Sequence, residues 1–307
     1  MSKSPPIVRR ALIGAMAAGL AGGGLYTLTR NRPPHRINVR QAGLVGTLFL
    51  PADTTDLPAI VSLTGAGGGF FERPAEALAG AGFAVLALAT HNAEGRPPTM
   101  RLLPVEYVID AVAWLRRWVQ PARGKVVLRG WSRGGELALL AASLSPEVNG
   151  VLAYAPRTYV GREQNRPNDF GDPTATAAFT WRGQPLDGEP LPEAMRFNRT
   201  NPSLEDMHGI AVERIAGPIM LITGSADTGL AGTTADFSAD QAMRRLELFK
   251  SPWRRQHDHY PDAGHDIAGP PPYIGHAEGG GTIAGNAAAV AASWPSAIGF
   301  LRAAGQV

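Results

Sequence analysis

The order of hydrophobic and polar positions predicts alternating strands and helices from about residue 43 onward. Short apolar or strand-like runs predict strands at residues 46–50, 59–63, 83–89, 125–128, 148–154, 219–223 and 254–260. Longer segments with helical character predict helices at residues 74–81, 105–119, 136–144, 241–249 and 284–301. Strands that alternate with helices indicate a mostly parallel sheet with helices on both faces.

One long stretch, residues 157–215, interrupts this alternation. It is rich in proline, arginine, asparagine and aspartate, and its aromatic residues are scattered. A long irregular insert in a compact domain is usually functional, often as a lid or a wall of the substrate site. A surface excursion without a role in binding remains the alternative.

The first 35 residues read as a targeting segment. Arg9 and Arg10 precede an apolar run at residues 11–26, and Pro33 and Pro34 follow it. A charged start, a short apolar middle and small residues are typical of an export signal, here loosely like a twin-arginine signal. We expect residues 1–35 to be a signal peptide or membrane anchor, so that the protein is exported or membrane-anchored. If this leader has no targeting role, the protein is cytoplasmic.

Composition narrows the class of protein. A chain of 307 residues that is 44% hydrophobic can bury one large core, which we expect to be a single domain over residues 36–307. Residues 1–40 carry seven Lys or Arg and no acidic residue, so the remainder has 22 basic against 26 acidic residues. The body of the protein is therefore not a basic nucleic-acid binder. Because there is no cysteine, a disulfide, a thiolate metal site and a cysteine nucleophile are excluded.

The most specific motif is a G-x-S-x-G sequence at residues 130–134, whose serine is Ser132. A predicted strand precedes it and a predicted helix follows it, as a nucleophile elbow requires. Such a turn lifts the serine hydroxyl above the sheet, at the positive end of the following helix. The alternative is an ordinary strand-to-helix loop in which the serine caps the helix.

A serine nucleophile needs an imidazole to accept its proton and a carboxylate to orient that imidazole. In this fold the order along the chain is serine, acid, histidine. Asp227 follows the predicted strand 219–223, and Asp236 and Asp240 are the alternatives for the acid. His265 follows Gly264 in a loop after the strand-like segment 254–260 and is the expected base.

His257 and His259 are two residues apart, so on a strand they share a face, which could suit a metal ion. Metal-assisted hydrolysis through these two histidines and Asp258 is one alternative mechanism. No third ligand is evident from the spacing, and we expect neither a metal nor another cofactor.

An oxyanion in the transition state needs N–H donors. The backbone N–H of Arg133, directly after the nucleophile, is the first candidate. The glycine-rich loop after strand 59–63 supplies the others, from residues Gly65, Ala66, Gly67 and Gly68. A flexible loop or a phosphate cradle is the alternative, but the phosphate-loop and dinucleotide patterns do not occur.

Several blocks of sequence resemble the hydrolase domain of the acyl-CoA thioesterase / bile acid-CoA:amino acid N-acyltransferase family. They are L-T-G-A-G-G-G-F at residues 63–70, G-F-A-V-L-A-L-A at 82–89, G-W-S-R-G-G-E-L-A-L at 130–139 and Y-P-D-A-G-H at 260–265. The C-terminal segments 271–273, 279–281 and 287–300 also resemble it. The resemblance implies an α/β-hydrolase fold, with Ser132, Asp227 and His265 matching the catalytic triad of the family.

The chain departs from this family in three respects. Only residues 43–50 precede the hydrolase core, which is too little for the β-sandwich domain that members commonly carry. Arg133 stands where lysine is usual, and the cysteine nucleophile of the acyltransferase members is missing, which favours water as acyl acceptor.

We therefore expect a serine hydrolase of acyl thioesters that works through an acyl-enzyme on a small-molecule substrate. The alternatives are an exported carboxylesterase or amidase and a catalytically silent binding protein.

Overall fold

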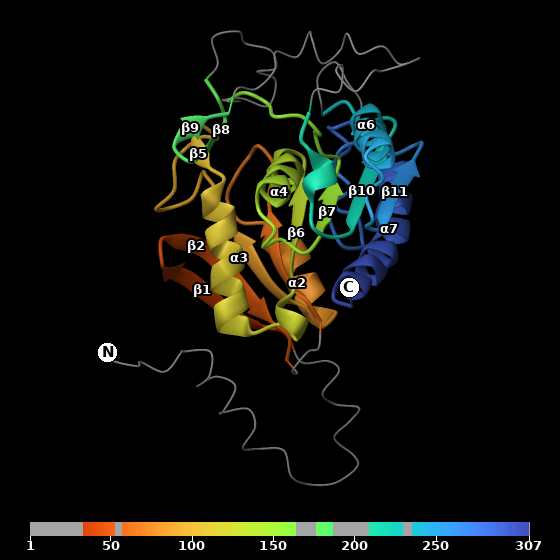
Figure 1. The fold of residues 1–307 in the computed structure, drawn as a ribbon. Helices are drawn as coiled ribbons and strands as arrows, with labels where there is room; N and C mark the ends of the chain where they lie inside the picture. The colour runs from red at the N-terminus through yellow and green to blue at the C-terminus, as the bar shows by residue number, and fades with distance from the viewer. Residues whose placement is uncertain (1–32, 53–56, 164–175, 187–208, 230–234, 307) are drawn as a thin grey trace, which may run out of the picture.

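The computed structural model describes residues 33–52, 57–163, 176–186, 209–229 and 235–306. These residues build an eight-stranded sheet in the order β1-β2-β4-β3-β6-β7-β10-β11 (Figure 1). The strands are β1 (His35–Gln41), β2 (Leu44–Leu50), β3 (Ala59–Leu63), β4 (Ala84–Leu88), β6 (Val126–Trp131), β7 (Val151–Tyr154), β10 (Ile219–Gly224) and β11 (Arg255–Tyr260). From β4 to β11 all neighbours are parallel, while β2 pairs antiparallel with β1 and β4.

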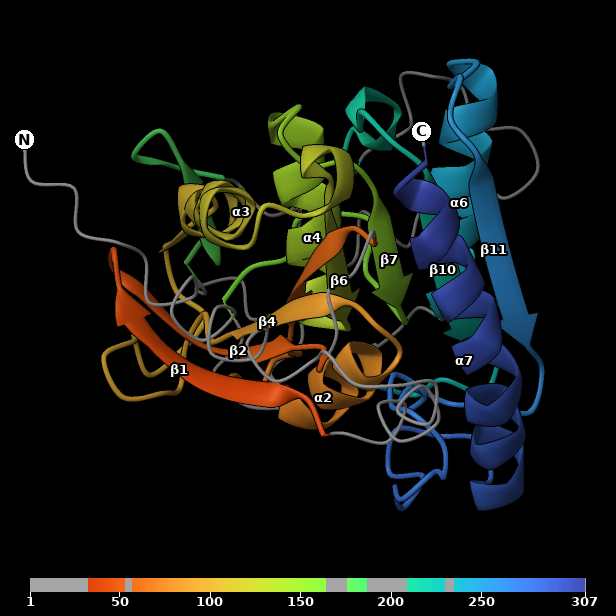
Figure 2. The same ribbon diagram turned by 90° about the horizontal axis from the view of Figure 1, so that it is seen from below.

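Helices cover both faces of this sheet, as Figure 2 shows. One face carries α3 (Glu106–Val119), α4 (Arg133–Leu144) and α6 (Ala235–Leu248), and the other carries α2 (Glu72–Gly80) and α7 (Ile283–Ala304). Successive strand residues point to opposite faces, so Val61 packs in the core under the first group of helices and Ile60 in the core under the second. The predicted mostly parallel α/β-hydrolase sheet is confirmed.

In the eight-stranded sheet and its helices the elements follow the hydrophobic pattern closely, and two differences are the largest. Helix α6 begins at Ala235, six residues before the predicted start at residue 241. Strand β1 was not predicted, because only Val39 among its residues is buried and the others are mostly polar. It forms a hairpin with β2 through Ala42 and Gly43, both with positive φ, and begins at His35, the last residue of the predicted leader.

The described part of the insert contributes to a small three-stranded sheet. In it β8 (Phe179–Trp181) lies between β5 (Leu103–Pro104) and β9 (Gln184–Pro185), and the short helix η4 (Val212–Arg214) follows. Residues 164–175 and 187–208 lie outside the described residues. A role of the insert as a lid therefore stays a prediction.

The predicted apolar run at residues 11–26 also lies outside the described residues. Within the part of the chain that the structure describes, no helix combines the length and the apolar character needed to cross a bilayer.

Candidate active site

The three predicted triad residues lie at one edge of the sheet. Ser132 follows β6, Asp227 follows β10, and His265 follows β11. Because these strands are parallel and β7 alone separates β6 from β10, their carboxyl ends lie close together at the same edge of the sheet. The residue before the serine, Trp131, donates its indole N–H to the carbonyl oxygen of His265 at 3.0 Å. Its ring centroid lies 5.5 Å from that of His265. The histidine loop is thereby held against the elbow.

The elbow itself has the strained geometry that the motif predicts. Ser132 has φ 54° and ψ −123°, a region that residues other than glycine rarely adopt. A Cβ atom at Gly130 would overlap the backbone of Gly134, and one at Gly134 would overlap the carbonyl of Thr64. These close approaches explain both glycines. Helix α4 begins at Arg133, whose backbone N–H lies in the first turn and has no partner within the helix.

Of the three candidate acids, Asp227 contacts the predicted base. Its Oδ2 lies 2.8 Å from Nδ1 of His265, and its Oδ1 accepts the N–H of Gly229 at 2.7 Å. The side chains of His265 and Asp227 are 9% and 0% exposed. An ionised carboxylate only accepts hydrogen bonds, so Nδ1 carries the proton and Nε2 is the basic nitrogen. Asp236 and Asp240 contact His259 and His257 instead.

Two features that sequence reasoning did not assign hold these loops in place. The carbonyl of Gly279 accepts the N–H groups of His265 and Thr228, each at 3.0 Å, and so links the histidine loop to the aspartate loop. The buried guanidinium of Arg129 donates to the carbonyl of Ala268, three residues after His265. Burial lowers the pKa of Arg129 to about 10, so the side chain stays charged at neutral pH. The sequence did offer one signal for Arg129, because a charged residue is unusual inside an otherwise apolar strand.

The glycine loop lies against the nucleophile, but not all of its N–H groups are free. A Cβ atom at Gly65 would stand 3.2 Å from the Cβ of Ser132. The N–H of Gly68 donates to the carbonyl of Gly65 at 3.1 Å. Gly68 is therefore removed from the predicted oxyanion donors, because a tight turn uses its N–H. Gly65, Ala66 and Gly67 remain, together with Arg133.

His91 fixes this loop and was not assigned from the sequence. Its Nε2 lies 2.9 Å from the carbonyl oxygen of Ala66, and its Nδ1 lies 3.0 Å from Oγ1 of Thr90. Since a carbonyl only accepts, Nε2 carries the proton. Burial, opposed by that hydrogen bond, lowers the pKa of His91, so the ring is neutral at neutral pH. The side-chain amide of Asn92 likewise donates a hydrogen bond to the carbonyl of Gly67, at 2.7 Å.

The side chain of Arg133 makes buried contacts that are separate from the predicted role of its backbone N–H. It forms an ion pair of 2.5 Å with Glu136, and both side chains are at most 1% exposed. Glu136 also accepts the N–H of Gly161 at 2.7 Å, and Arg133 donates to the carbonyl of Arg162 at 2.9 Å. Burial lowers the pKa of Arg133, and Glu136 opposes this shift. The pair ties the first turn of α4 to the start of the insert.

The predicted alternative metal set is not brought together as proposed. His257 and His259 lie beside β10 in register with Leu221 and Thr223, on the face that α6 covers. The carboxylate of Asp258 turns to the opposite face, where it accepts the hydroxyl of Ser296 in α7 at 2.7 Å. The side-chain period of two along a strand explains this separation.

Comparison with known proteins places the chain first in a fold class. Two solved structures that it resembles are a dienelactone hydrolase from Anabaena variabilis and a puromycin-hydrolyzing peptidase from Mycobacterium tuberculosis. The first has a TM-score of 0.52 and 18% identity, and the match covers 88% of this chain and 97% of that chain. The second has a TM-score of 0.55 and 18% identity, covering 92% of this chain and 41% of that one. The fold is that of the α/β-hydrolases.

The family follows from the sequence comparison. Residues 103–304 match the family described as BAAT / Acyl-CoA thioester hydrolase C terminal, and the chain belongs to this family. It is 34% identical to acyl-coenzyme A thioesterase 1 of Homo sapiens over 259 residues, covering 79% of this chain and 56% of that protein. For acyl-coenzyme A thioesterase 1 of Rattus norvegicus the identity is 32% over 246 residues, covering 78% and 55%. The chain spans about half the length of these relatives.

Proposed function

We propose that this protein is a serine hydrolase that cleaves acyl thioesters through Ser132, His265 and Asp227. The observation that carries the proposal is the 2.8 Å contact between Asp227 and His265 beside a serine with φ 54°. A buried carboxylate on Nδ1 leaves Nε2 to accept the serine proton. Family membership and the thioesterase relatives support an acyl thioester as substrate.

The reaction follows from these positions. Oγ of Ser132 attacks the acyl carbonyl carbon while Nε2 of His265 takes its proton, and Asp227 stabilises the imidazolium. The oxyanion is stabilised by the N–H of Arg133 and by N–H groups of the Gly65 to Gly67 loop. His265 then protonates the leaving thiolate as the carbon–sulfur bond breaks. Water, activated by the same histidine, releases the acid from the acyl-enzyme.

The test uses the full chain, with wild type beside Ser132→Ala, assayed against acyl-CoA thioesters and p-nitrophenyl esters in parallel. Ser143→Ala is the matched control, because that serine lies in the same helix and only donates to the carbonyl of Leu140. We expect CoA release by wild type and by the control, and its loss in Ser132→Ala. A fluorophosphonate probe that labels serine nucleophiles should react at Ser132 alone.

Two other outcomes would change the assignment. Ester hydrolysis without CoA release would make the protein a carboxylesterase. This outcome would agree with the alternative of an exported enzyme. No hydrolysis of either substrate, with no labelling of Ser132, would overturn the triad and leave a binding protein. Fractionation of cells that express the full chain tests the expected export or anchoring by residues 1–35.

A further inference from the structure

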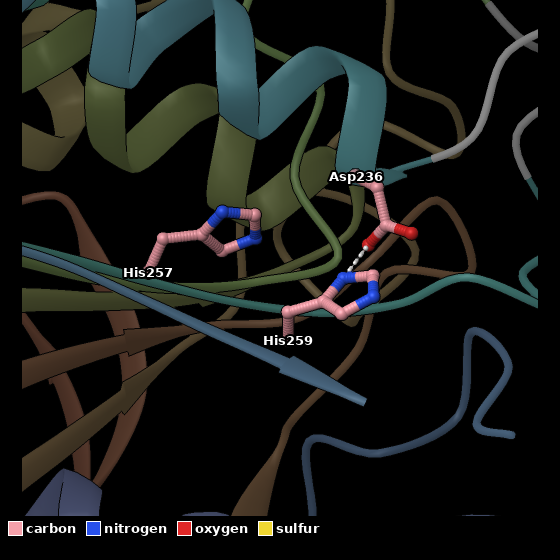
Figure 3. A group of neighbouring side chains, drawn as sticks. All are labelled: Asp236, His257 and His259. Atoms are coloured by element: carbon pink, nitrogen blue, oxygen red, sulfur yellow. Dashed lines mark ion pairs between the residues drawn. The ribbon is translucent and has the colours of Figure 1, made fainter. Parts of the chain in front are cut away.

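A second cluster of ionisable side chains lies on the α6 face of the sheet, apart from the triad. One ligand atom each from Asp236, His257 and His259 lies within 4.8 Å of the other two (Figure 3). Asp236 belongs to the first turn of α6 and both histidines to the edge strand β11, so the cluster joins residues that are 21 and 23 positions apart in the chain. We propose that these three side chains form a binding site for one divalent transition-metal ion such as Zn²⁺.

The secondary structure explains why the groups meet. Side chains four apart on a helix are stacked about 6 Å apart, and side chains two apart on a strand are separated by about 6.6 Å. Asp236 and Asp240 on α6 therefore match His259 and His257 on β11. The contacts are 3.0 Å from Asp236 Oδ1 to Nδ1 of His259 and 3.3 Å from Asp240 Oδ1 to Nδ1 of His257.

An unsatisfied carboxylate oxygen points to a missing cation. Oδ1 of Asp236 is buried, and its contact with His259 lacks the alignment of a hydrogen bond. It has no hydrogen-bond partner among the residues that the structure describes. A buried acceptor without a donor is costly, and a metal ion would satisfy it.

The donor set selects the class of ion. Two imidazoles and one carboxylate suit Zn²⁺ and related transition ions, whereas Mg²⁺ and Ca²⁺ prefer oxygen ligands alone. Tetrahedral Zn²⁺ ligands at about 2.0–2.1 Å from the ion are about 3.4 Å from each other, so the groups must move inward by at most about 1.4 Å.

The cluster is open to solvent on one side, and neighbouring hydroxyls contact its two imidazole rings. The side chain of His259 is 42% exposed and that of Asp240 is 73% exposed, which gives an ion a path from solvent. Hydroxyls orient both rings, since Oγ1 of Thr223 lies 2.7 Å from Nε2 of His257 and Oγ of Ser225 lies 2.9 Å from Nε2 of His259.

The experiment measures Zn²⁺ binding to the full chain, prepared without a histidine tag and freed of metal by a chelator. Calorimetry should give one ion per chain, and Tm should rise by about 5 °C or more at a hundredfold excess over Kd. Co²⁺ should give visible absorption bands that report its coordination geometry. Asp236→Asn and His259→Gln should each weaken binding at least about tenfold and abolish the Co²⁺ bands.

His276→Gln is the matched control, since this exposed histidine lies outside the cluster. It should bind Zn²⁺ as wild type does. His259→Gln, at a partly exposed position, serves if Asp236→Asn does not fold. Absence of saturable binding to wild type, or binding that neither variant weakens, would overturn the proposal.

Discussion

Two histidine–carboxylate pairs lie near the same end of the sheet, and they differ in what surrounds them. In the pair of His265 and Asp227 both carboxylate oxygens have hydrogen-bond partners, and both side chains are almost fully buried. In the pair of His259 and Asp236 the imidazole is 42% exposed and Oδ1 lacks a hydrogen-bond partner among the described residues. Loop hydrogen bonds and burial thus distinguish the pair that we propose to orient a catalytic base from the pair that we propose to bind a cation.

The largest effect should come from breaking the first pair at its acid. Asp227→Asn reverses the hydrogen bond to Nδ1 and favours the wrong tautomer of His265, so kcat for thioester hydrolysis should fall by about 10⁴. The measurement is steady-state kinetics of the full chain with acyl-CoA. Zn²⁺ affinity should stay within about twofold of wild type, because distant sites act independently.

The control for this variant is Asp258→Asn. That carboxylate lies on the opposite face of the same strand as His259 and accepts from Gln256 and Ser296. Its kcat should remain within about threefold of wild type, as for most substitutions away from a site. Equal losses in the two variants would mean that the loss in Asp227→Asn does not arise from its contact with His265.

The effect of burial can also be tested on arginine–glutamate pairs, by comparing the buried pair of Arg133 and Glu136 with a more exposed one. Glu136→Gln leaves a buried guanidinium without its counter-charge and should lower the free energy of unfolding by about 3–5 kcal/mol. Urea titration measures this loss. Glu147→Gln, in the partly exposed pair with Arg116, should change it by about 1 kcal/mol or less. Similar losses in both variants would show that burial does not set the difference.

A third, smaller effect should follow from loosening the oxyanion loop. His91→Phe removes the donor to the Ala66 carbonyl, and misplacement of the loop should reduce kcat by about 10- to 100-fold with little change in KM. His91→Gln, whose amide can donate to the same carbonyl, should recover part of the loss. If the phenylalanine variant retains full kcat, His91 does not position the donors.

The smallest predicted effect is on pH dependence, through the same histidine. Burial lowers the pKa of His91 below its ordinary 6.5, so the unfolded chain binds the proton first as the pH falls. The stabilisation is complete above about pH 6.5 and is lost toward lower pH. Between pH 7.5 and 5.5, wild type should lose more stability than His91→Gln in chelator-treated urea titrations. Equal losses would mean that folding does not lower the pKa of His91.

The sequence predicted the sheet because its central strands are buried on both faces and read as continuous apolar runs. It also indicated Ser132, Asp227 and His265, since an elbow and the order of acid and base leave local signals. Strand β1 was not predicted, because an edge strand buries few residues and its polar pattern resembles that of a loop.

The missed parts of the site depend on contacts between distant segments. His91 meets Ala66 across 25 positions and Asp236 meets His259 across 23, and no local periodicity encodes such pairs. Asp258 was grouped with the neighbouring histidines by adjacency in sequence, although alternation along a strand sends it to the other face. The hydrogen bond that removes Gly68 from the donor set likewise depends on the conformation of the turn.

The anchoring of the insert has a consequence for how new specificities could arise. Glu163 donates its N–H to the carbonyl of Thr176 at 2.8 Å, and Arg162 forms an antiparallel bridge with Ala177. The chain thus leaves and re-enters at adjoining points, so doubling the length between them costs only about 0.6 kcal/mol in closure entropy. Changes in the length or sequence of the segment between Glu163 and Thr176 should therefore leave the contacts of Arg133 with Glu136 and with the carbonyl of Arg162 in place.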